Sequence, residues 1–551
     1  MPMNAVTSFL VQKEGNAVRD MAVLMVVFGL FFMIFLGQLP LLEPDEGRYA
    51  EIPREMLERN DFITPHLNHV KYFEKPPLHY WVNACSLAAF GRNEFAARFP
   101  SALLGLGGVL LIYCVGRRIY GRREGLHGAL ILGSSLGYLV LGRMNSIDMT
   151  LTFCMSATLG FFLMAARDGE SRKGLFYHLF YVFAALTVLA KGLIGIVLPG
   201  GIIFSYLLLT RRWRLLREMR LGSGILLFLA VCAPWFVLVS LKNPEFPQFF
   251  FIHEHFQRFL TKVHKRYEPP WFFIPIILLG MIPWTFFLPE ALRNLWQTRD
   301  HRKIFLTLWA GVIFAFFSAS SSKLIPYMLP VFPALALLLG ATISDAFDRD
   351  EWSLRGYFLA AAAFLCVAGL GFVLYPQLTA NPKIGVDGAL AVGAVFLVGG
   401  FLSLLLLRKK RRELAMALIC LASCVGGVIA PPVIFARAVE KKSTRELSRI
   451  IRERYPDVPL VSYGYYRQDL PFYTGKRVII AGSSGELEFG RLREKDPGWF
   501  IDPATFFSLW DSPRQVMTLI GRNDLILFQR VVKTPAHVVA EWGQTVLITN
   551  K

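Results

Sequence analysis

Residues 21–39 read MAVLMVVFGLFFMIFLGQL, an apolar run without a single charged side chain. A helix that crosses the hydrocarbon core of a bilayer needs roughly 17–25 mainly apolar residues. A polar segment precedes this run, and no small-residue cleavage site follows it, so we interpret it as an uncleaved first transmembrane helix. This stretch places the chain among membrane proteins.

The composition of the whole chain agrees with that placement. Hydrophobic residues make up 54% of the 551 residues and charged residues only 18%, whereas soluble domains carry about 25% charged residues. Further apolar segments of spanning length follow, and we predict about thirteen transmembrane helices. They lie near residues 21–39, 100–116, 127–141, 147–166, 177–191, 193–209, 222–241, 272–289, 304–319, 325–345, 357–375, 388–407 and 413–433.

The distribution of basic residues predicts the orientation. The formal net charge is +19, and most of the excess lies in alternate short loops, such as 117–123, 211–220 and 408–412. Loops rich in Lys and Arg stay in the cytoplasm, so the N-terminus is predicted to be cytoplasmic and the C-terminus to lie outside. Because the excess follows the topology, no nucleic-acid partner is expected. The basic residues in the short loops of the other set are only Arg143, Lys191, Lys323 and Lys383.

The chain divides into two predicted domains. Residues 1–435 form a transmembrane domain with two long outer loops, 40–99 and 242–271, and residues 436–551 form a small soluble α/β domain. The first loop is predicted to hold two interfacial helices, at 46–59 and 78–90. In the tail we expect a helix at 443–455 with Ser443 as its N-cap. Strands are expected at 460–461, 477–481, 524–531 and 545–549.

The first cluster of candidate functional residues is Glu43-Pro44-Asp45-Glu46-Gly47-Arg48-Tyr49, just outside the first span. A carboxylate such as Asp45 can act as a base or stabilise developing positive charge, and Arg48 can bind a phosphate with two parallel hydrogen bonds. The motif starts just outside the first span, at the depth of the lipid phosphates in the bilayer. Tyr49 is therefore a further candidate for substrate binding. The alternative is structural, with Asp45 serving as the N-cap of a solvated helix.

The second cluster is Lys71-Tyr72-Phe73-Glu74-Lys75-Pro76-Pro77-Leu78-His79-Tyr80. Lys75 is a point charge suited to a phosphate and stands before a rigid Pro-Pro turn. Tyr72 belongs to the same candidate binding surface. The alternative is that Lys75 only extends its charge from the membrane interface to water.

Two further candidates mark outer ends of later spans. Asp148 opens the fourth predicted span, where a carboxylate is either functional or a helix N-cap. Lys323 and Tyr327 flank the start of the tenth span and could contact a phosphate.

The segment His253-Glu254-His255-Phe256-Gln257-Arg258 is a weaker candidate, for a metal site. His and carboxylate side chains are ligands that zinc accepts, and Glu74 in the first outer loop is a plausible partner for His255. Arg258 is a further candidate for phosphate binding. His-x-His alone is more often a structural pattern than a metal site.

These motifs together resemble the membrane glycosyltransferases of the GT-C superfamily. The residues that carry the resemblance are Glu43-Pro44-Asp45-Glu46, Glu74-Lys75-Pro76-Pro77, Asp148, and His255-x-x-Arg258 with Pro283-Trp284 downstream. More narrowly, the chain resembles the 4-amino-4-deoxy-L-arabinose lipid A transferases, relatives of the protein O-mannosyltransferases. The resemblance implies a polytopic α-helical fold with periplasmic interfacial helices, and a catalytic acidic residue at Asp45.

The resemblance also implies an activity. The donor would be 4-amino-4-deoxy-L-arabinose linked to undecaprenyl phosphate, and the acceptor a phosphate of lipid A at the periplasmic face of a bacterial inner membrane. A different acceptor or sugar is the alternative within the same class. The chain is expected to act as a monomer without a required cofactor, and Glu74 and His255 are the residues that would hold a zinc ion if one is used.

A transporter or lipid flippase is the hypothesis from a different class. Ion-coupled transporters place ionisable residues near the midplane of the bilayer and often contain inverted repeats. The middle of the predicted spans contains almost no ionisable residues, and no repeat is evident. The charged outer loops therefore favour an enzyme.

Overall fold

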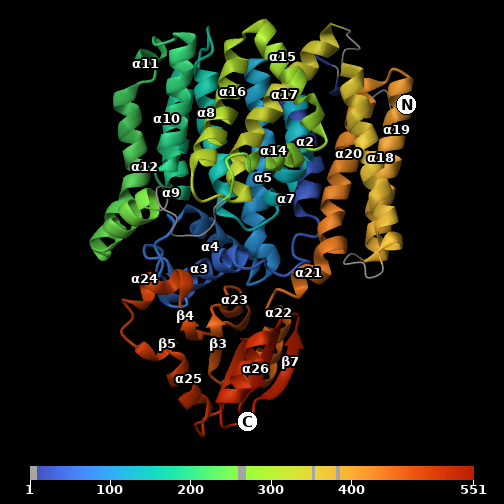
Figure 1. Ribbon diagram of the computed structural model, residues 1–551. Helices are drawn as coiled ribbons and strands as arrows, with labels where there is room; N and C mark the ends of the chain where they lie inside the picture. The colour runs from blue at the N-terminus through green and yellow to red at the C-terminus, as the bar shows by residue number, and fades with distance from the viewer. Residues whose placement is uncertain (1–8, 11, 258–267, 350–353, 380–384) are drawn as a thin grey trace. The chain divides into compact units, whose positions relative to one another are not determined.

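The computed structural model describes residues 9–10, 12–257, 268–349, 354–379 and 385–551, without the side chains of 255–257, 435, 437 and 438. The chain separates into two compact units. The first unit comprises residues 1–35 and 101–434, and the second comprises residues 36–100 and 435–551. Figure 1 shows the helical first unit and the sheet of the second.

In the described residues the first unit consists of helices and their connecting segments, and each of the thirteen predicted spans overlaps a helix or a bent pair of helices. Its elements are α2 (Ala17–Met33), α5 (Glu94–Ile119, which starts in the second unit), α6 (Arg122–Ser134), α7 (Leu136–Gly142), α8 (Ile147–Ala165), α9 (Lys173–Lys191), α10 (Ile194–Thr210), α11 (Leu215–Glu218), α12 (Leu221–Lys242), η1 (Gln248–Gln257), α14 (Phe273–Gly280), η2 (Trp284–Phe287), α15 (Leu288–Thr298), α16 (His301–Ala319), η3 (Ile325–Val331), α17 (Phe332–Asp348), α18 (Arg355–Leu378), α19 (Val386–Arg408), α20 (Arg412–Ala430) and η5 (Pro431–Phe435).

Length and hydropathy identify a multi-pass membrane protein but count fewer spans than predicted. Within the described residues, nine helices are long and apolar enough to cross a membrane, or up to eleven if the pairs α6–α7 and α14–α15, bent by 64° and 107°, each count as one. The other two predicted spans are α2 and α10, with 17 residues each, at the lower limit for a spanning helix. The number thirteen remains a prediction.

The helix ends of the first unit fall into two groups. One group carries the basic loops 117–123, 167–173, 211–220 and 299–303, and we call it the arginine-rich end. Here the fully buried Asp20 accepts hydrogen bonds from Arg122 Nε at 2.6 Å and from Tyr113 Oη at 2.7 Å, which ties α2 to α5 and α6. Asp148 and Lys191 lie at the opposite ends of α8 and α9.

The second unit joins the first outer loop to the C-terminal residues. The loop contains α3 (Asp45–Arg59), the short strands β1 (His66–Leu67) and β2 (Val70–Lys71), and α4 (Leu78–Phe90), which confirms both predicted loop helices. Residues 40–99 were assigned from the sequence to the transmembrane domain, but they pack with the tail. A shared apolar cluster explains this difference: Leu41, Ala50, Leu87, Ala96 and Ala97 pack on Phe472 and Tyr473.

The C-terminal part is a small α/β fold, as predicted. Its six-stranded sheet has the order β5-β4-β3-β6-β8-β7; β5, β4, β3 and β6 run parallel, and β8 and β7 continue antiparallel (Figure 1). The elements are α21 (Ala436–Glu440), α22 (Arg445–Arg454), β3 (Leu460–Tyr465), α23 (Leu470–Thr474), β4 (Ile479–Ser483), η6 (Gly485–Leu487), α24 (Glu488–Arg491), η7 (Pro497–Trp499), β5 (Phe500–Ile501), α25 (Pro503–Trp510), β6 (Met517–Gly521), α26 (Arg522–Val531), β7 (His537–Trp542) and β8 (Thr545–Thr549).

Alternation along the strands builds a core on both faces of this sheet. Val461 packs with Trp510 and Phe528 of helices α25 and α26 on one face, while its neighbour Leu460 packs with Leu447 of α22 on the other. Successive side chains of a strand point to opposite faces, so a single strand serves both cores.

Two expectations for the tail were wrong. Residues 524–531 form helix α26 and not a strand, because Leu525 and Phe528, three residues apart, are buried while Ile526 and Leu527 are exposed. The N-cap of α22 is Thr444 and not Ser443; the Thr444 N–H donates to Asp469 at 2.8 Å. The strands β5, β6 and β7 were not predicted.

The two edges of the sheet are irregular. The edge strand β5 has only two residues. The opposite edge strand β7 has a register shift between Val538 and Ala540 in its pairing with β8.

Candidate functional site

Helix α3 presents the first candidate cluster in the second unit. Its first residue is Asp45, and its N-cap is Pro44, which provides no side-chain hydrogen bond. The interpretation of Asp45 as an N-cap is therefore wrong. The Asp45 carboxylate is about half exposed and forms an ion pair with Arg48, one turn further along the helix. The carboxylate is free of a capping role and available for chemistry.

Arg48 is the buried centre of this cluster, with 4% of its surface exposed. Its guanidinium pairs with Asp45 and with Glu486, and donates to the Tyr72 hydroxyl at 3.2 Å. It also lies over the ring of Tyr49, 5.1 Å from the centroid. The cluster thus brings together four of the predicted residues and adds one, Glu486, from the C-terminal part.

Electrostatics keep this arginine charged. Burial alone would lower the pKa of Arg48, but Tyr72 and Tyr49 oppose that effect and the pKa is raised well above its ordinary value. Burial also raises the pKa of Tyr72, which therefore stays a neutral donor or acceptor. A fixed cation in a site of low polarity is an effective partner for a phosphate.

Aromatic and amide side chains from α4 surround Tyr49. Its ring packs edge-on against His79 with a centroid distance of 5.6 Å, and Tyr80 lies 6.3 Å away. Asn83, one turn along α4, contacts His79 Nε2 at 3.1 Å. His79, Tyr80 and Asn83 are buried, so this wall holds Tyr49 against Arg48.

Glu74 and Lys75 lie in the turn before α4. Pro76 and Pro77 end this turn, and Pro77 is the N-cap of the helix, in agreement with the predicted rigid turn. Both side chains are partly buried, and Lys75 Nζ donates to the Glu74 carbonyl at 2.7 Å. The lysine is thus bonded to its own turn, and its contact with a phosphate remains a prediction.

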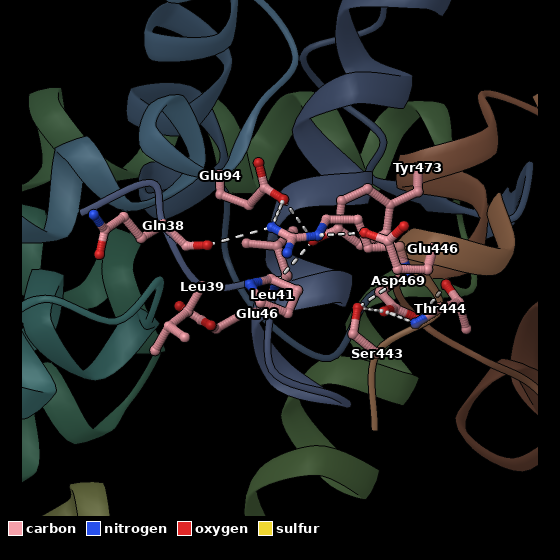
Figure 2. A network of polar contacts seen from close by, with 12 residues as sticks. Gln38, Leu39, Leu41, Glu46, Glu94, Ser443, Thr444, Glu446, Asp469 and Tyr473 are labelled. Atoms are coloured by element: carbon pink, nitrogen blue, oxygen red, sulfur yellow. Dashed lines mark hydrogen bonds and ion pairs between the residues drawn. The ribbon is translucent and has the colours of Figure 1, made fainter. Parts of the chain in front are cut away.

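A buried network fixes the chain between the first span and α3. The Arg98 guanidinium binds the Glu46 carboxylate with two hydrogen bonds of 2.8 and 2.7 Å and also donates to the carbonyls of Leu36, Leu39 and Pro40. Figure 2 shows Glu46 and Glu94 in this network, where Tyr473 donates to Glu94 at 3.1 Å and Arg445 pairs with Glu94 at 3.2 Å. Glu46, next to Asp45, therefore has a structural role.

The C-terminal part supplies a second group of polar contacts to the same loop. Arg467 pairs with Glu43 at 3.0 Å, and the Asp469 N–H donates to Glu43 at 3.3 Å. Figure 2 shows Asp469 beside Ser443 and Thr444, whose hydroxyls donate to it at 2.8 and 2.9 Å. Burial, and then the nearby charge of Asp469, raise the pKa of Glu43 well above its ordinary value.

In the first unit, Asp148 forms an ion pair with Lys191, the last residue of α9. Their side chains are only 14% and 9% exposed. Lys191 Nζ also lies 4.5 Å from the ring centroid of Tyr327, so two predicted residues meet around a lysine. Ser146, and not Asp148, caps α8, because its hydroxyl accepts from the Asp148 N–H at 3.1 Å.

Lys323 is buried and lies two residues before η3, the element that contains Tyr327. Its ammonium donates to the carbonyls of Ser320 at 2.7 Å and Glu268 at 2.9 Å. These bonds fix the loop, and a contact to phosphate remains a prediction.

The candidate metal site is only partly described. Residue 255 lies in η1 without a described side chain, and Arg258 lies outside the described residues. Zinc sites in proteins use three or four ligands, and the described side chains contain no group of three or more His, Cys, Asp or Glu suited to a metal ion. Glu74 alone does not make a site, so the zinc ligands remain a prediction.

Sequence reasoning missed Lys191, Glu486, Arg467 and Asp469. Lys191 carried a usable signal, because it is an isolated basic residue at the end of an apolar span in a loop otherwise poor in charge. Glu486 pairs with Arg48, and Asp469 with Glu43, which precedes α3. Each pair is separated by more than 400 residues, so Glu486 and Asp469 have no local signature.

Comparison with known proteins gives concordant results over both units. Residues 74–238 match the family model for dolichyl-phosphate-mannose-protein mannosyltransferases, and residues 447–550 match the model for the aminoarabinose transferase C-terminal domain. A curated undecaprenyl phosphate-alpha-4-amino-4-deoxy-L-arabinose arabinosyl transferase of Aeromonas hydrophila is 34% identical over 408 residues, 71% of this chain and 73% of the relative. The protein of the same name from Pseudomonas paraeruginosa is 35% identical over 369 residues, 65% of this chain and 66% of the relative.

Solved structures agree. ArnT from Cupriavidus metallidurans bound to undecaprenyl phosphate superposes with a TM-score of 0.87 at 31% identity, covering 96% of this chain and 98% of that chain. The oligosaccharyltransferase of Archaeoglobus fulgidus superposes with a TM-score of 0.54 at 13% identity, covering 91% of this chain and 70% of that chain, and shows similarity of fold alone.

Proposed function

Because the chain belongs to the family of undecaprenyl phosphate-4-amino-4-deoxy-L-arabinose arabinosyl transferases, we propose that it transfers 4-amino-4-deoxy-L-arabinose to a phosphate of lipid A. It is a multi-pass membrane glycosyltransferase of the GT-C type that uses a polyprenyl-phosphate-linked sugar. The observation that carries the assignment to a site is the buried, charged Arg48 between the carboxylates of Asp45 and Glu486.

The reaction exchanges one phosphate ester at the sugar for another. The bond between the anomeric carbon and the donor phosphate oxygen breaks, and an oxygen of the acceptor phosphate forms the new bond to the same carbon. Undecaprenyl phosphate leaves with the bonding electrons, so negative charge grows on its phosphate. Arg48 and Lys75 are the cations in the second unit that would stabilise this charge.

Asp45 performs a different task. An acceptor phosphate is already anionic near pH 7 and needs no strong base, unlike a hydroxyl group. The Asp45 carboxylate would therefore orient Arg48 and hold the ammonium group of the aminosugar, while the hydroxyl of Tyr72 hydrogen-bonds Arg48 and completes the binding surface.

The first unit has a set of polar groups of its own. Lys191, paired with Asp148 and covered by Tyr327, is a cation in a low-polarity setting and is suited to a phosphate or to the acceptor. Arg258 and Lys323 are the other proposed phosphate ligands of this unit. Zinc would use Glu74 and His255, and no step of the proposed transfer requires it.

The expected setting follows from the topology. We place the protein in the bacterial inner membrane as a monomer, with the N-terminus in the cytoplasm and the C-terminal part in the periplasm. The arginine-rich end then faces the cytoplasm.

The test is reconstitution of transfer with defined substrates. Purified protein in lipid nanodiscs receives undecaprenyl phosphate-linked 4-amino-4-deoxy-L-arabinose together with lipid A, and the products are analysed by mass spectrometry. We expect lipid A to gain one aminosugar for each undecaprenyl phosphate released. Transfer to a protein or glycan acceptor but not to lipid A would favour the alternative acceptor, and vectorial movement of the donor lipid without transfer would favour a flippase.

A further inference from the structure

A cavity of about 180 Å³ lies at the arginine-rich end of the first unit, at the opposite end of α8 from Asp148. The ends of four helices enclose it: the last residue of α5, the last turn of α8, α10, and the start of α16. Helix α10 packs against both α8 and α16 (Figure 1). Along α8, the cavity is roughly 27 Å from Asp148, at ~1.5 Å per residue.

The cavity is amphipathic. Its floor consists of the buried side chains of Ile119, Leu163 and Ala166. Its rim consists of the charged or titratable residues Arg167, Asp168, His301 and Arg302, and the fully buried Tyr206 also lines it. An apolar floor with a polar rim at the end of membrane helices suits the headgroup region of a lipid more than a fully water-soluble ligand.

The cations around the rim differ in how firmly they are held. Arg302 is fixed, since it binds Asp300 at 2.7 Å, donates to the Ile119 carbonyl at 2.9 Å and lies over the Tyr120 ring. Arg167 is half exposed, and its carboxylate contact is to Glu170 at 3.9 Å. Glu170 is already engaged by Arg118 with two bonds of 2.8 and 2.6 Å, so it compensates little of the positive charge of Arg167.

Arg212 contacts two of the lining residues, Tyr206 and Asp168. It donates to the Tyr206 hydroxyl at 3.2 Å and to Asp168 at 2.6 Å. The Asp168 side chain is 82% exposed, and an exposed ion pair is weak. Arg212 thus offsets only part of the negative charge that Asp168 places on the cavity lining.

From this arrangement we infer that the cavity binds the phosphate-bearing headgroup of an anionic membrane phospholipid. Arg167 binds the phosphate, Arg302 and His301 border it, and the floor receives the glycerol end. Basic pockets between transmembrane helices commonly bind anionic headgroups. The volume is below the roughly 300–1,000 Å³ of pockets for whole drug-sized molecules, which agrees with a headgroup and not a whole soluble cofactor.

The test is native mass spectrometry of the purified full chain in detergent, titrated with phosphatidylglycerol, phosphatidylethanolamine or phosphatidylcholine. We expect the first phosphatidylglycerol to bind more tightly than the other two lipids.

Four variants test which residues hold the lipid. Arg167→Ala should weaken this binding about fivefold, the contribution typical of one basic residue near an anionic lipid, and Ala166→Leu should weaken it by filling the floor. Asp168→Asn should tighten it by removing a lining carboxylate that repels the phosphate. Arg293→Ala, on α15 outside the cavity lining, should match the wild type.

Transfer activity in detergent without added phospholipid should be the same in all four variants, which shows that they are folded. Equal phosphatidylglycerol binding by Arg167→Ala, Ala166→Leu and the wild type would overturn the inference. Displacement of the bound lipid by millimolar inorganic phosphate would also overturn it, because the site would then be a free-phosphate site.

Discussion

Glu486, in the turn η6 of the C-terminal part, forms an ion pair with the buried Arg48 of helix α3. The pair joins residues 438 positions apart and is formed within one compact unit. The C-terminal part, in which the sequence suggests no catalytic motif, thus contributes directly to the surroundings of the proposed phosphate-binding arginine.

Arg48→Lys should lower kcat/KM by about 10²-fold, because lysine cannot contact two carboxylates and a phosphate in the planar geometry of arginine. Glu486→Gln should cost about tenfold, as expected for a residue that positions Arg48. The double variant should be no worse than Arg48→Lys alone, since both changes affect one interaction. The control pair is Arg491 and Glu488 on α24, an exposed ion pair; Arg491→Lys with Glu488→Gln should leave turnover unchanged. Strict additivity of the Arg48 and Glu486 effects would separate Glu486 from the site.

Asp45→Asn should reduce turnover by at least about 10²-fold, the low end for the loss of one electrostatic contact, with little change in stability. The residue makes no capping hydrogen bond, and the amide has the same size as the carboxylate. Asp387→Asn, in the first turn of α19, is the matched control and should affect neither quantity. Measurement of transfer and of thermal unfolding on the same preparations separates chemistry from folding. Normal turnover in folded Asp45→Asn protein would return Asp45 to a structural role.

Lys191→Met should destabilise the protein by up to about 3 kcal/mol, the lower end for a buried pair, because it leaves the partly buried Asp148 carboxylate without its partner. The double variant Lys191→Met with Asp148→Leu should recover most of that stability but remain inactive if the pair serves the reaction. Lys173→Met with Glu218→Gln changes a more exposed ion pair whose residues are 45 positions apart in sequence, against 43 for Lys191 and Asp148. It should have little effect on stability or activity. Recovery of activity along with stability in the double variant at Lys191 and Asp148 would make the pair purely structural.

The stability of the second unit should fall as pH rises above the ordinary range of a glutamic acid. Burial and the charge of Asp469 raise the pKa of Glu43 in the folded state above the ordinary value of 4.5, so the folded state binds the extra proton. Because the pKa of Glu43 is higher in the folded than in the unfolded state, its proton stabilises the fold. This stabilisation is fully present below the unfolded pKa and is lost as the pH rises through the folded pKa. The slope is at most about 1.4 kcal/mol per pH unit per group.

Hydrogen exchange of the full chain between pH 5 and 8, read in α23 and β3, measures this effect. Glu43→Gln should flatten the pH dependence. Glu488→Gln is the control: hydrogen bonds from Arg491 and then Ser484 lower the pKa of Glu488 to about 2, so its titration lies below this window. An unchanged slope in Glu43→Gln would assign the pH dependence to other groups, such as the buried Glu51 and Glu55, whose pKa values burial also raises.

Alkaline phosphatase fused after Lys551 should be active, and the same enzyme inserted in the loop 117–123 should be inactive, because alkaline phosphatase matures only outside the cytoplasm. This result follows from a cytoplasmic N-terminus and an odd number of spans. The reverse pattern of activities would invert the proposed orientation.

Local patterns were sufficient for the helices and for part of the site. Helix α4 begins and ends where the sequence predicts, at residues 78 and 90, because a Pro-Pro turn starts it and Gly91 follows it. Asp45, Arg48 and Tyr49 could be grouped because they share one helix. Tyr72 joined them in the structure through the hairpin of β1 and β2.

Other features depend on contacts between distant segments and could not be found locally. Lys191 meets Asp148 only because α8 packs on α9, and Glu486 meets Arg48 only because the tail folds onto the first outer loop. Helix α26 failed as a strand prediction because four consecutive apolar residues fit either structure, and burial of Leu525 and Phe528 decides between them.

The two irregular edges of the C-terminal sheet have a consequence for what this part can recruit. An exposed regular edge strand invites another chain to add a strand by main-chain hydrogen bonds, which leads to aggregation or to peptide capture. A two-residue β5 and a bulged β7 interrupt that ladder on both sides. The sheet is therefore protected against fibril-like self-association at high density in the membrane, and a polypeptide acceptor would find no template for docking there.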